Sequence, residues 1–521
     1  MSGVRPIRRA LISVADKTDL VELGRELLSL GVSLVSSGTT ARTLQEAGVD
    51  VTPVAEVTGF PEMLDGRVKT LHPRIHAGIL ADRRLPEHGQ ELKEHDIEPF
   101  DLVVSNLYPF RETVASGAAF DDVIENIDIG GPTLVRGAAK NFESVAIVVR
   151  PERYTELLEE LRRDGGLSRE TRLALAEEAF AHTASYDAAI ADWFAGRQTD
   201  EGLPSFVGLA YDKVRELRYG ENPHQRGALY STGGGPGPFG GAEVLQGKEM
   251  SFNNWLDLDA AAGLAADLDA TADAASGTAA CVIVKHNNPC GAAIAPTLGE
   301  AYRRAFASDD VSAFGGIVAF GGEVDADAAQ AMEDVFTEVI VAPAYTDGAR
   351  NAFAARENLR VVRAPLSARP DLDVRPMIGG ALVQDADRIV EGRQEMKVVS
   401  RREPTEAEWR DLLFAWTVGA RVKSNAIVFA KDRATVGVGA GQMSRVDSAV
   451  LAARKAGERA RGAVMASDAF FPFPDAVEVS ADAGITAVIH PGGSVRDEEV
   501  LRVAESRDMA VVVTGRRHFR H

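Results

Sequence analysis

Short apolar runs alternate with stretches of helical spacing over residues 1–150. The run "RALISVAD" has the character of a strand, and "TDLVELGRELLSLG" after it places apolar residues on one face of a helix. A strand followed by a helix and another strand favours a parallel, doubly wound sheet. The strands that this pattern predicts are 9–16, 32–38, 101–110 and 144–150, with helices at 18–31 and from residue 39.

Two further helical stretches, 151–166 and 168–197, close this part of the chain. The segment 198–204 that follows is polar, rich in turn-forming residues and without periodicity, which is typical of a linker. We therefore expect two domains, 1–200 and 201–521.

The second domain is also predicted to be α/β, because β-rich runs alternate with helical segments through it. Segments 281–320 and 426–473 each combine strands with a helix in the same order, which indicates two related subdomains. The glycine-rich segment 231–243 is expected to be a loop. The predicted strands of this domain are 281–286, 314–320, 337–343, 359–365, 424–431, 486–493 and 509–515.

Composition narrows the classes of function. At 521 residues the chain is too long for one ordinary core. A net charge of -20 argues against a general nucleic-acid binder, but it leaves room for local basic pockets. Two cysteines form no disulfide framework, and neither a signal peptide nor a membrane-spanning apolar run is found. We expect a soluble, cytoplasmic protein without nucleic-acid or membrane partners.

Basic and hydroxyl residues follow the predicted strands of the first domain. The segment "SSGTT" (36–40) lies where a strand meets a helix, and such a helix start can bind phosphate, although an ordinary N-cap has the same sequence. Lys17, Arg67, Lys69 and Lys140 add positive charge, and each alone is more often a solvated side chain. Together they indicate a phosphorylated ligand at the carboxyl ends of the strands.

The segment "IVKHNNPCG" leaves three chemistries open: a metal site, a nucleophilic Cys290, or an acid–base pair of Lys285 and His286. It resembles half of the H-x-E…P-C-x-x-C motif of zinc deaminases. However, Asn288 stands in place of the glutamate and Ala293 in place of the second cysteine. Zinc hydrolysis is therefore disfavoured, and Cys290 without a CxxC partner is expected to pack in a core.

Two weaker motifs point to other classes of protein. His72 and His76 are spaced like metal ligands on a helix, but Pro73 lies between them and no HExxH glutamate accompanies them. The run "GVGAGQ" (437–442) suggests a dinucleotide-binding or non-catalytic module, but it lacks the third glycine of G-x-G-x-x-G. We give neither motif much weight.

Longer motifs carry a resemblance to a known family. "SVADKT", "SSGTT", "GRVKTLHP", "SNLYPF" and "IDIGGPTLVRGAAKN" resemble, in this order, the cyclohydrolase half of the bifunctional purine-biosynthesis family. That family combines phosphoribosylaminoimidazolecarboxamide (AICAR) formyltransferase with IMP cyclohydrolase. "LRYGENPHQ", "VKHNNPCGAA", "SAFGGIVA", "KSNAIVFAK", "GVGAGQMSRVDS" and "SDAFFPFPD" resemble its transformylase half, as does the terminal "RRHFRH".

The resemblance implies a methylglyoxal-synthase-like cyclohydrolase domain at 1–200 and a formyltransferase domain at 201–521 made of two cytidine-deaminase-like subdomains. It implies the last two steps of IMP synthesis: 10-formyltetrahydrofolate formylates AICAR to FAICAR, and FAICAR closes to IMP with loss of water. The partners would be nucleotide monophosphates and folate, with no metal needed for the chemistry. The family is homodimeric, and its transformylase site is built across the dimer.

The resemblance also assigns residues to the cyclohydrolase site. Ring closure needs a base, an oxyanion stabiliser and an acid that helps to expel water. One tension is visible, because Lys140 lies about 12 Å along a helix that starts at Pro132. To share a site with Asp128, that helix must be short or the chain must turn back. The implied catalytic residues are Lys69, Tyr108, Asp128 and Lys140, and the implied nucleotide contacts are Ser13, Lys17, Ser37, Gly38, Thr39, Arg67, Thr70, Asn106, Gly130 and Gly131.

In the transformylase site the resemblance makes His286 the base, with Lys285 beside it. Neighbouring residues of a regular strand face opposite ways, so we expect Asn-Asn-Pro to end the strand and let both side chains reach one pocket. Asn425 is expected to bond with His286 or with the carboxamide of AICAR. The implied AICAR contacts are Arg218, Tyr219, Gly315, Glu338, Asn425 and Arg445, and the implied folate contacts are Val446, Asp475, Ser494, Arg517 and His521.

Overall fold

The computed structural model describes residues 3–197, 202–232, 238–271, 279–366 and 371–521. The chain forms two compact units, Met1–Tyr211 and Asp212–His521, called unit 1 and unit 2 below. The domain boundary expected between residues 200 and 201 lies outside the described residues. That each unit carries one activity stays a prediction.

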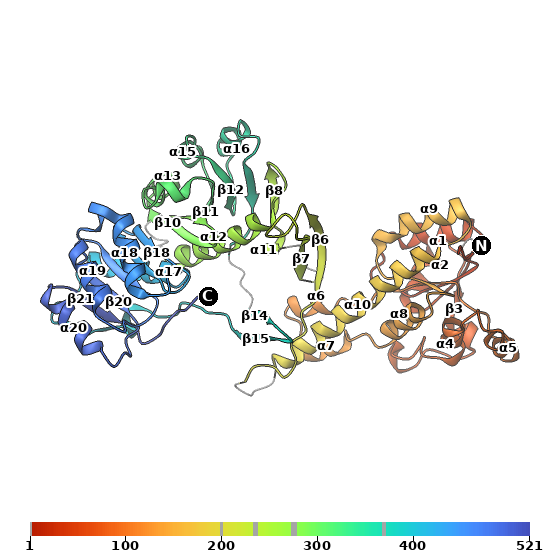
Figure 1. Cartoon of the computed structure of the whole chain (residues 1–521). Coiled ribbons are helices and arrows are strands. Elements are labelled where there is room, and N and C mark those ends of the chain that lie inside the picture. The colour runs from red at the N-terminus through yellow and green to blue at the C-terminus, as the bar shows by residue number, and fades with distance from the viewer. Residues whose placement is uncertain (1–2, 198–201, 233–237, 272–278, 367–370) are drawn as a thin grey trace. The chain divides into compact units, whose positions relative to one another are not determined.

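Unit 1, coloured red to yellow in Figure 1, contains a five-stranded parallel sheet. The order of its strands is β3-β2-β1-β4-β5. Its strands are β1 Arg9–Ile12, β2 Ser33–Ser36, β3 Thr52–Pro53, β4 Leu102–Val104 and β5 Ala146–Val148. Its helices are α1 Leu20–Ser29, α2 Gly38–Glu46, α3 Val54–Thr58, α4 Pro73–Leu80, α5 Pro86–Glu94, α6 Phe110–Ala115, α7 Phe120–Glu125, α8 Gly130–Lys140, α9 Tyr154–Asp164 and α10 Arg169–Ala195, with 3-10 turns at Leu64–Gly66 and Pro151–Arg153.

The strands of unit 1 are apolar on both sides because helices cover both faces of the sheet. Ala10 and Ile12 of β1 pack in one cluster with residues of α1 and α9. Leu11, between them, packs on the other face with residues of α4, α8 and α10. The predicted doubly wound parallel sheet is thus confirmed.

Unit 2 contains a mixed sheet whose described strands number twelve, in the order β16-β21-β20-β19-β17-β18-β10-β9-β11-β12-β13-β8. These strands are β8 Glu243–Gln246, β9 Ala279–Lys285, β10 Asn288–Ala295, β11 Gly316–Phe320, β12 Thr337–Ala342, β13 Arg360–Arg363, β16 Lys397–Val398, β17 Ile427–Lys431, β18 Ala434–Gly439, β19 Val464–Ser467, β20 Ala487–His490 and β21 Ala510–Val513. Two small hairpins pair β6 Tyr211–Leu217 with β7 Gly227–Thr232 and β14 Leu372–Met377 with β15 Gly380–Asp385.

Helices cover both faces of this sheet as well. α12 and α17 share one apolar cluster that runs across both halves of the sheet. On the other face, α13, α15 and α16 pack on one half, and α18, α19 and α20 pack on the other. The helices are α11 Pro238–Gly241, α12 Phe252–Thr271, α13 Leu298–Phe306, α14 Asp310–Ala313, α15 Ala326–Ala331, α16 Asp347–Ala354, α17 Glu406–Gly419, α18 Arg445–Ala456, α19 Asp475–Ala483 and α20 Asp497–Ser506, with 3-10 turns at Arg393–Glu395 and Gly457–Ala460.

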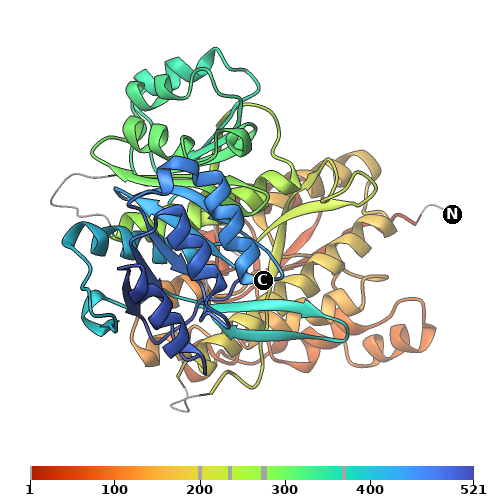
Figure 2. The ribbon, with the colours of Figure 1, turned by 60° about the vertical axis from the view of Figure 1, so that its left-hand side comes forward.

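The two halves of the large sheet repeat each other. Counted outward from the central β10–β18 pair, the strands β10, β9, β11, β12, β13 and β8 correspond in order to β18, β17, β19, β20, β21 and β16. In Figures 1 and 2 the first set lies in the green part of the chain and the second mostly in the blue part. The repeat expected from segments 281–320 and 426–473 is therefore present, whereas its likeness to cytidine deaminases stays a prediction.

Glycines in the central strands explain why the pattern of apolar residues did not reveal β10 and β18. A Cβ added at Gly291 would lie 1.9 Å from the carbonyl oxygen of Ala305 in α13, and one added at Gly439 would lie 1.9 Å from that of Ser448 in α18. These strands are glycine-rich because helices pack directly on their backbone. The first three residues of the run "GVGAGQ", 437–439, are thus the buried end of β18, and the other three lie between β18 and α18.

Segment 231–243, expected to be a loop, contains the end of β7, helix α11 and the start of β8, and its residues 233–237 lie outside the described part. Over the described ranges, no helix combines the length and the apolar character that crossing a membrane requires.

Candidate active sites

Polar side chains gather at the carboxyl ends of the strands of unit 1. Ser13 follows β1 and Ser37 follows β2, and their hydroxyl oxygens are 3.4 Å apart. Asn106 follows β4, and its Oδ1 accepts hydrogen bonds from the backbone N–H groups of Ala15 and Asp16 at 2.6 and 3.0 Å. Asn106 therefore shapes the loop that carries Lys17, and a ligand at this edge would meet hydroxyls and backbone donors.

The start of α2 faces a basic and an acidic side chain. Gly38 has φ of 55°, and its N–H donates to Oε1 of Glu62 at 3.0 Å. A Cβ added at Gly38 would lie 3.2 Å from Nζ of Lys69. A carboxylate thus occupies the helix start where the sequence predicts a phosphate, with Lys69 next to it.

Asp128 lies at the start of α8, where backbone donors surround its carboxylate. The N–H of Gly131 donates to it at 2.8 Å, and Tyr186 of α10 accepts from the N–H of Asp128 at 2.8 Å. Burial raises the pKa of Asp128. The hydrogen bonds from the backbone N–H groups of Gly131 and Tyr108 and the charge of Lys69 lower this pKa, but by less. Asp128, Lys69 and Tyr108 therefore lie close enough to act on one ligand.

Neither Lys140 nor Arg67 is placed as the sequence suggested. Helix α8 runs unbroken from Gly130 to Lys140, so its ends are about 15 Å apart. Lys140 is exposed at the end that leads into β5, whereas Asp128 precedes the other end. The structure does not bring Lys140 to Asp128, and its catalytic role stays a prediction. Arg67 forms an ion pair with Glu125 on the surface.

In unit 2, Lys285 and His286 lie at the tip of the β9–β10 hairpin. His286 and Asn287 form a two-residue turn with φ of 53° and 61°, and Asp257 of α12 accepts from both of their N–H groups, at 3.2 and 2.6 Å. The strand ends at Lys285, as expected, but the turn comes one residue earlier than Asn-Asn-Pro suggested, because Asn288 already pairs in β10.

The tip of this hairpin lies next to the segment that leads into β17. Oδ1 of Asn288 accepts from the N–H of Lys423 at 3.0 Å. Asn425, two residues on, accepts from the guanidinium of Arg445 at 2.8 Å and donates to the carbonyls of Gln442 and Met443. The amide of Asn425 is thus engaged within this half of the sheet and not by His286, while its bond with the carboxamide of AICAR stays a prediction.

The C-terminal segment joins the same edge of the sheet. The carbonyl of Arg520 accepts from the N–H of Ser424 at 2.9 Å, and the N–H of His518 donates to the carbonyl of Asp468 at 3.1 Å. Asp468 is buried and forms an ion pair with Arg445. The terminal residues are therefore ordered next to Asn425 and Arg445.

Comparisons with known proteins identify the family. A family model described as the AICARFT/IMPCHase bienzyme matches residues 138–455, more than half of the chain, and one described as an MGS-like domain matches residues 19–133. The chain belongs to the AICARFT/IMPCHase bienzyme family. It is accordingly a bifunctional enzyme of purine biosynthesis, AICAR formyltransferase and IMP cyclohydrolase, as the resemblance implied.

Relatives match this bienzyme over its whole length. Proteins named "Bifunctional purine biosynthesis protein PurH" are 50% identical in Desulfitobacterium hafniense (strain DSM 10664 / DCB-2), over 99% of this chain and 100% of the relative, and 51% identical in Cereibacter sphaeroides (strain ATCC 17025 / ATH 2.4.3), over 100% of both. A solved structure described as "Crystal structure of ForH" is 38% identical over 36% of this chain and 99% of that chain, with a TM-score of 0.32.

The bienzyme's predicted folate and AICAR residues lie largely along one edge of the sheet. The parallel strands β19, β20 and β21 end at this edge, and Asp475, Ser494 and Arg517 follow them in turn. Val446 is partly buried in α18, next to Arg445. His521 packs its ring 5.7 Å from that of Phe519.

In the other half of the sheet, Gly315 and Glu338 lie where β11 and β12 begin, which is the edge of the Lys285 tip. Asn254 donates to the carboxylate of Glu338 at 2.9 Å. Arg218 and Tyr219 instead follow β6, with the guanidinium of Arg218 5.7 Å from the centre of the Tyr219 ring.

Both cysteines belong to the apolar core. Cys281 and Cys290 are buried in the cluster below α13, and burial raises the pKa of the Cys290 thiol to about 12. A thiol held in its neutral form is a poor nucleophile, so the predicted packing role of Cys290 is supported. His72 caps α4, its Nδ1 accepting from the N–H of Arg74 at 3.2 Å, and Pro73 begins that helix rather than breaking it.

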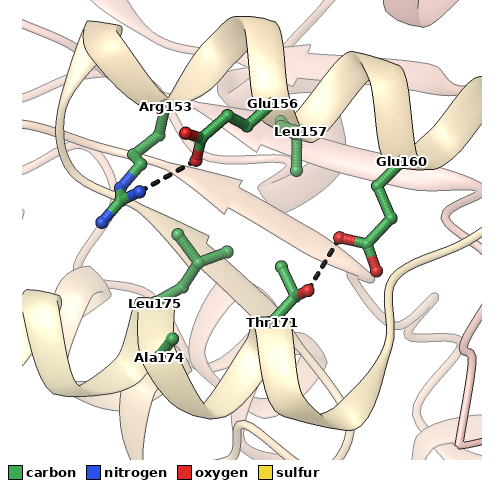
Figure 3. A pocket seen from close by; sticks show the side chains of 7 residues that line it. All are labelled: Arg153, Glu156, Leu157, Glu160, Thr171, Ala174 and Leu175. Carbon is green, nitrogen blue, oxygen red and sulfur yellow. Dashed lines mark hydrogen bonds and ion pairs between the residues drawn. The ribbon is translucent and has the colours of Figure 1, made fainter.

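A shallow pocket between α9 and α10 lies apart from all these residues (Figure 3). Its charged groups are paired, Arg153 with Glu156 at 2.9 Å and Glu160 with the hydroxyl of Thr171 at 2.7 Å. None of the predicted site residues lines it. The lining residues are Arg153, Glu156, Leu157, Glu160, Thr171, Ala174 and Leu175.

Several residues that shape these sites gave no signal in the sequence. Asp468 neutralises Arg445, Asp257 holds the His286 turn, and Tyr186 accepts from the backbone of Asp128. Each is distant in sequence from the residue it supports. Of the three, only Asp468, which follows a strand, and Asp257, which lies on an apolar helix, stand at positions that could have suggested a polar partner.

Proposed function

We propose that unit 2 transfers the formyl group of 10-formyltetrahydrofolate to AICAR, and that unit 1 closes the resulting FAICAR to IMP. Membership of the bienzyme family over the whole chain carries this proposal. The separate gathering of polar residues at one edge of each unit's sheet supports it.

For ring closure, the carboxamide nitrogen must attack the formamido carbon while its proton leaves. Lys69 offers a cation for the oxyanion that forms. Asp128, with its raised pKa, is suited to accept and return a proton at the reacting atoms. Hydroxyls of Ser13 and Ser37 and the loop of Lys17 would hold the phosphate.

For formyl transfer, the AICAR amine is a weak nucleophile because its electron-poor ring withdraws its lone pair. His286 at the exposed hairpin tip is the proposed base that removes a proton during attack. Asp475 is proposed to hold the folate, since a carboxylate accepts from the neighbouring N–H donors of a pterin. The other contacts are proposed on the resemblance alone.

Three further properties are proposed on the resemblance to the family. These are the homodimer with a shared transformylase site, the cytoplasmic location, and formyl transfer without a metal. Sedimentation of the purified protein tests the first of them.

Separate assays of two variants test the assignment of the two reactions. We expect His286→Ala to lower formyl transfer by about 10²–10⁴-fold, the usual contribution of a general base, and to leave FAICAR cyclisation intact. Asp128→Asn keeps the shape and an acceptor for the N–H of Gly131, and we expect it to do the reverse.

Circular dichroism and thermal melting would verify that both variants fold. If a folded variant lost both activities, the assignment of one reaction to each unit would be wrong. Loss of neither activity in His286→Ala would remove this residue from the mechanism.

A further inference from the structure

The last seven residues of the chain, 515–521, contain one buried side chain. His518 has 1% of its surface exposed, whereas Arg517, Phe519 and His521 on either side of it are exposed. The guanidinium of Arg517 lies 4.6 Å from the centre of the Phe519 ring, and the ring of His521 lies 5.7 Å from the same centre. These three exposed residues therefore form one stack, called the terminal stack below, and His518 faces the interior beneath it.

The imidazole of His518 lies between two carboxylates of the segment that joins β15 to β16. Its Nδ1 is 2.8 and 2.9 Å from the two carboxylate oxygens of Asp387, and its Nε2 is 3.1 Å from Oε2 of Glu391. Both ring nitrogens thus have acceptors, which suits an imidazolium, because both of its nitrogens donate. Arg516 forms an ion pair with Glu391 at 3.0 Å, and the ring of Trp416 packs edge-on against the imidazole at 5.3 Å.

The segment that accepts these hydrogen bonds is itself held in place. The guanidinium of Arg421 donates to the backbone carbonyl of Asp387 at 3.1 Å. The same guanidinium forms an ion pair at 2.6 Å with Asp267, which lies on α12. His518 therefore binds the end of the chain to a segment that is already joined to a core helix of unit 2.

Backbone contacts of the same C-terminal residues reach the proposed AICAR contacts. The N–H of His518 donates to the carbonyl of Asp468 at 3.1 Å, and the carbonyl of Arg520 accepts from the N–H of Ser424 at 2.9 Å. The carboxylate of Asp468 accepts from the hydroxyl of Ser424 at 2.5 Å and forms the ion pair with Arg445. The end of the chain is thus fixed on one side by His518 and on the other by the edge of the sheet.

From these contacts we infer that His518 is a positioning residue for formyl transfer: held between Asp387 and Glu391, it fixes the terminal stack where folate binds. This inference rests on the proposed function, in which Arg517 and His521 contact the folate. His518 itself does not touch a substrate, because its ring is buried and both nitrogens are engaged. A stack that is ordered beforehand binds its ligand more tightly, since binding then does not have to immobilise those side chains.

Replacement of the imidazole by an amide tests this role. In His518→Gln we expect the KM for 10-formyltetrahydrofolate to rise by about tenfold, because Arg517 and His521 must then be ordered at the expense of binding energy. The KM for AICAR should change much less, because Arg445 keeps its ion pair with Asp468. Closure of added FAICAR should remain at the wild-type rate, because the residues proposed for it lie in unit 1.

Glu408→Gln is the matched control, because it changes another buried charged contact of unit 2 into an amide. Glu408 forms an ion pair with Arg402 at 2.7 Å and accepts from the hydroxyl of Thr486 at 2.7 Å, next to the start of β20 and not its carboxyl end. We expect this variant to melt at a lower temperature and to keep both KM values. The amide of Ser424 should exchange its hydrogen faster in His518→Gln and at the wild-type rate in Glu408→Gln.

The inference is refuted if folded His518→Gln has the wild-type KM for 10-formyltetrahydrofolate, or if both KM values rise alike in His518→Gln and in Glu408→Gln. Should His518→Gln not fold, Asp387→Asn decides by the same KM values, because the side chain of Asp387 is 39% exposed and tolerates the change more easily. An inactive wild-type protein would refute the proposed function instead. The exchange of the Ser424 amide would then still decide whether His518 holds the end of the chain.

Discussion

A buried histidine holds the C-terminal segment. Nδ1 of His518 lies 2.8 and 2.9 Å from the two carboxylate oxygens of Asp387, and Nε2 lies 3.1 Å from Oε2 of Glu391. Burial alone would lower the pKa of His518, but the hydrogen bonds and charges of Asp387 and Glu391 outweigh it and raise this pKa. Two arginines also face these residues. The guanidinium of Arg516 lies 3.0 Å from the carboxylate of Glu391, and that of Arg421 donates to the backbone carbonyl of Asp387 at 3.1 Å.

This histidine makes stability depend on pH. Because its pKa is higher in the folded than in the unfolded protein, its stabilisation is complete below about pH 6.5 and is lost as the pH rises through the folded value. We expect the melting temperature to fall as the pH rises above about 6.5, and His518→Gln to remove most of this pH dependence. Thermal melting at a series of pH values and constant ionic strength measures this dependence.

The exposed His224 provides the control for that slope. His224→Gln should retain the full pH dependence, because its ring lies in solvent. An unchanged slope in His518→Gln would contradict the assignment of the effect to this contact.

At the residue scale, the sequence could predict side chains that follow strands but not those that support them. Ser37 and Lys17 follow strands, as the pattern placed them, whereas Ser13 and Asn106, assigned by the resemblance, fall inside the predicted strands 9–16 and 101–110 but lie after β1 and β4. The partners of Arg445 and His518, by contrast, are Asp468 and Asp387, and only the fold brings them close. Charge pairs between distant segments leave no periodic trace in a sequence.

At the scale of elements, an aspartate on a helix determines the shape of each hairpin turn. All four turn residues, 286–287 after β9 and 432–433 after β17, have positive φ, between 53° and 61°, which costs energy for residues other than glycine. Asp257 and Asp411 compensate by accepting two backbone N–H groups each. The tip that carries His286 therefore depends on α12.

Removing either aspartate should have a similar effect on stability and a different effect on activity. We expect Asp257→Ala and Asp411→Ala each to lower the free energy of unfolding by about 1–3 kcal/mol, since two N–H groups lose their acceptor. Asp257→Ala should also lower formyl transfer by about 10–100-fold, because His286 loses its orientation. Denaturant unfolding and formyl-transfer assays on both variants measure these effects.

Asp411→Ala is the control, because its turn has no imidazole. Full activity in Asp257→Ala would show that the orientation of His286 does not depend on this contact. Equal loss of activity in both variants would point to a general effect on the fold.

The elements themselves were predictable wherever packing follows a simple period. In unit 1, β1, β2, β4 and β5 fall inside the predicted strands because buried parallel strands are short apolar runs, and α1, α9 and α10 fall inside predicted helices. The short strand β3 and the helices α3 to α7 were not predicted. β10 and β18 were missed because close contact with α13 and α18 requires glycine in place of apolar side chains. The length of α8 could not be inferred from Pro132, since the helix begins two residues earlier, at Gly130.

At the scale of the whole molecule, each unit has its own sheet and its own apolar clusters. The residues proposed for ring closure all lie in unit 1, and those proposed for formyl transfer all lie in unit 2. The conversion of AICAR to IMP then needs one intact site of each kind, and FAICAR must pass from one site to the other.

Mixing the two single-site variants tests this division on the complete chain. Alone, His286→Ala should make FAICAR from AICAR about 10²–10⁴-fold more slowly than the wild type, and Asp128→Asn should accumulate it. In an equimolar mixture we expect IMP to form after a lag, because FAICAR released by one chain reaches the intact cyclohydrolase site of another. Absorbance monitors the formation of IMP, and formyl-transfer activity is assayed in the same mixture. The two readouts together measure the rescue.

His286→Ala at twice its concentration is the control, and it should remain nearly inactive on AICAR while closing added FAICAR. If the mixture accumulated FAICAR without forming IMP although His286→Ala closes added FAICAR, the intermediate would have to stay bound to the chain that makes it. The division into two self-sufficient sites therefore predicts that the lag shortens as the concentration of His286→Ala rises, because FAICAR then meets an intact cyclohydrolase site sooner.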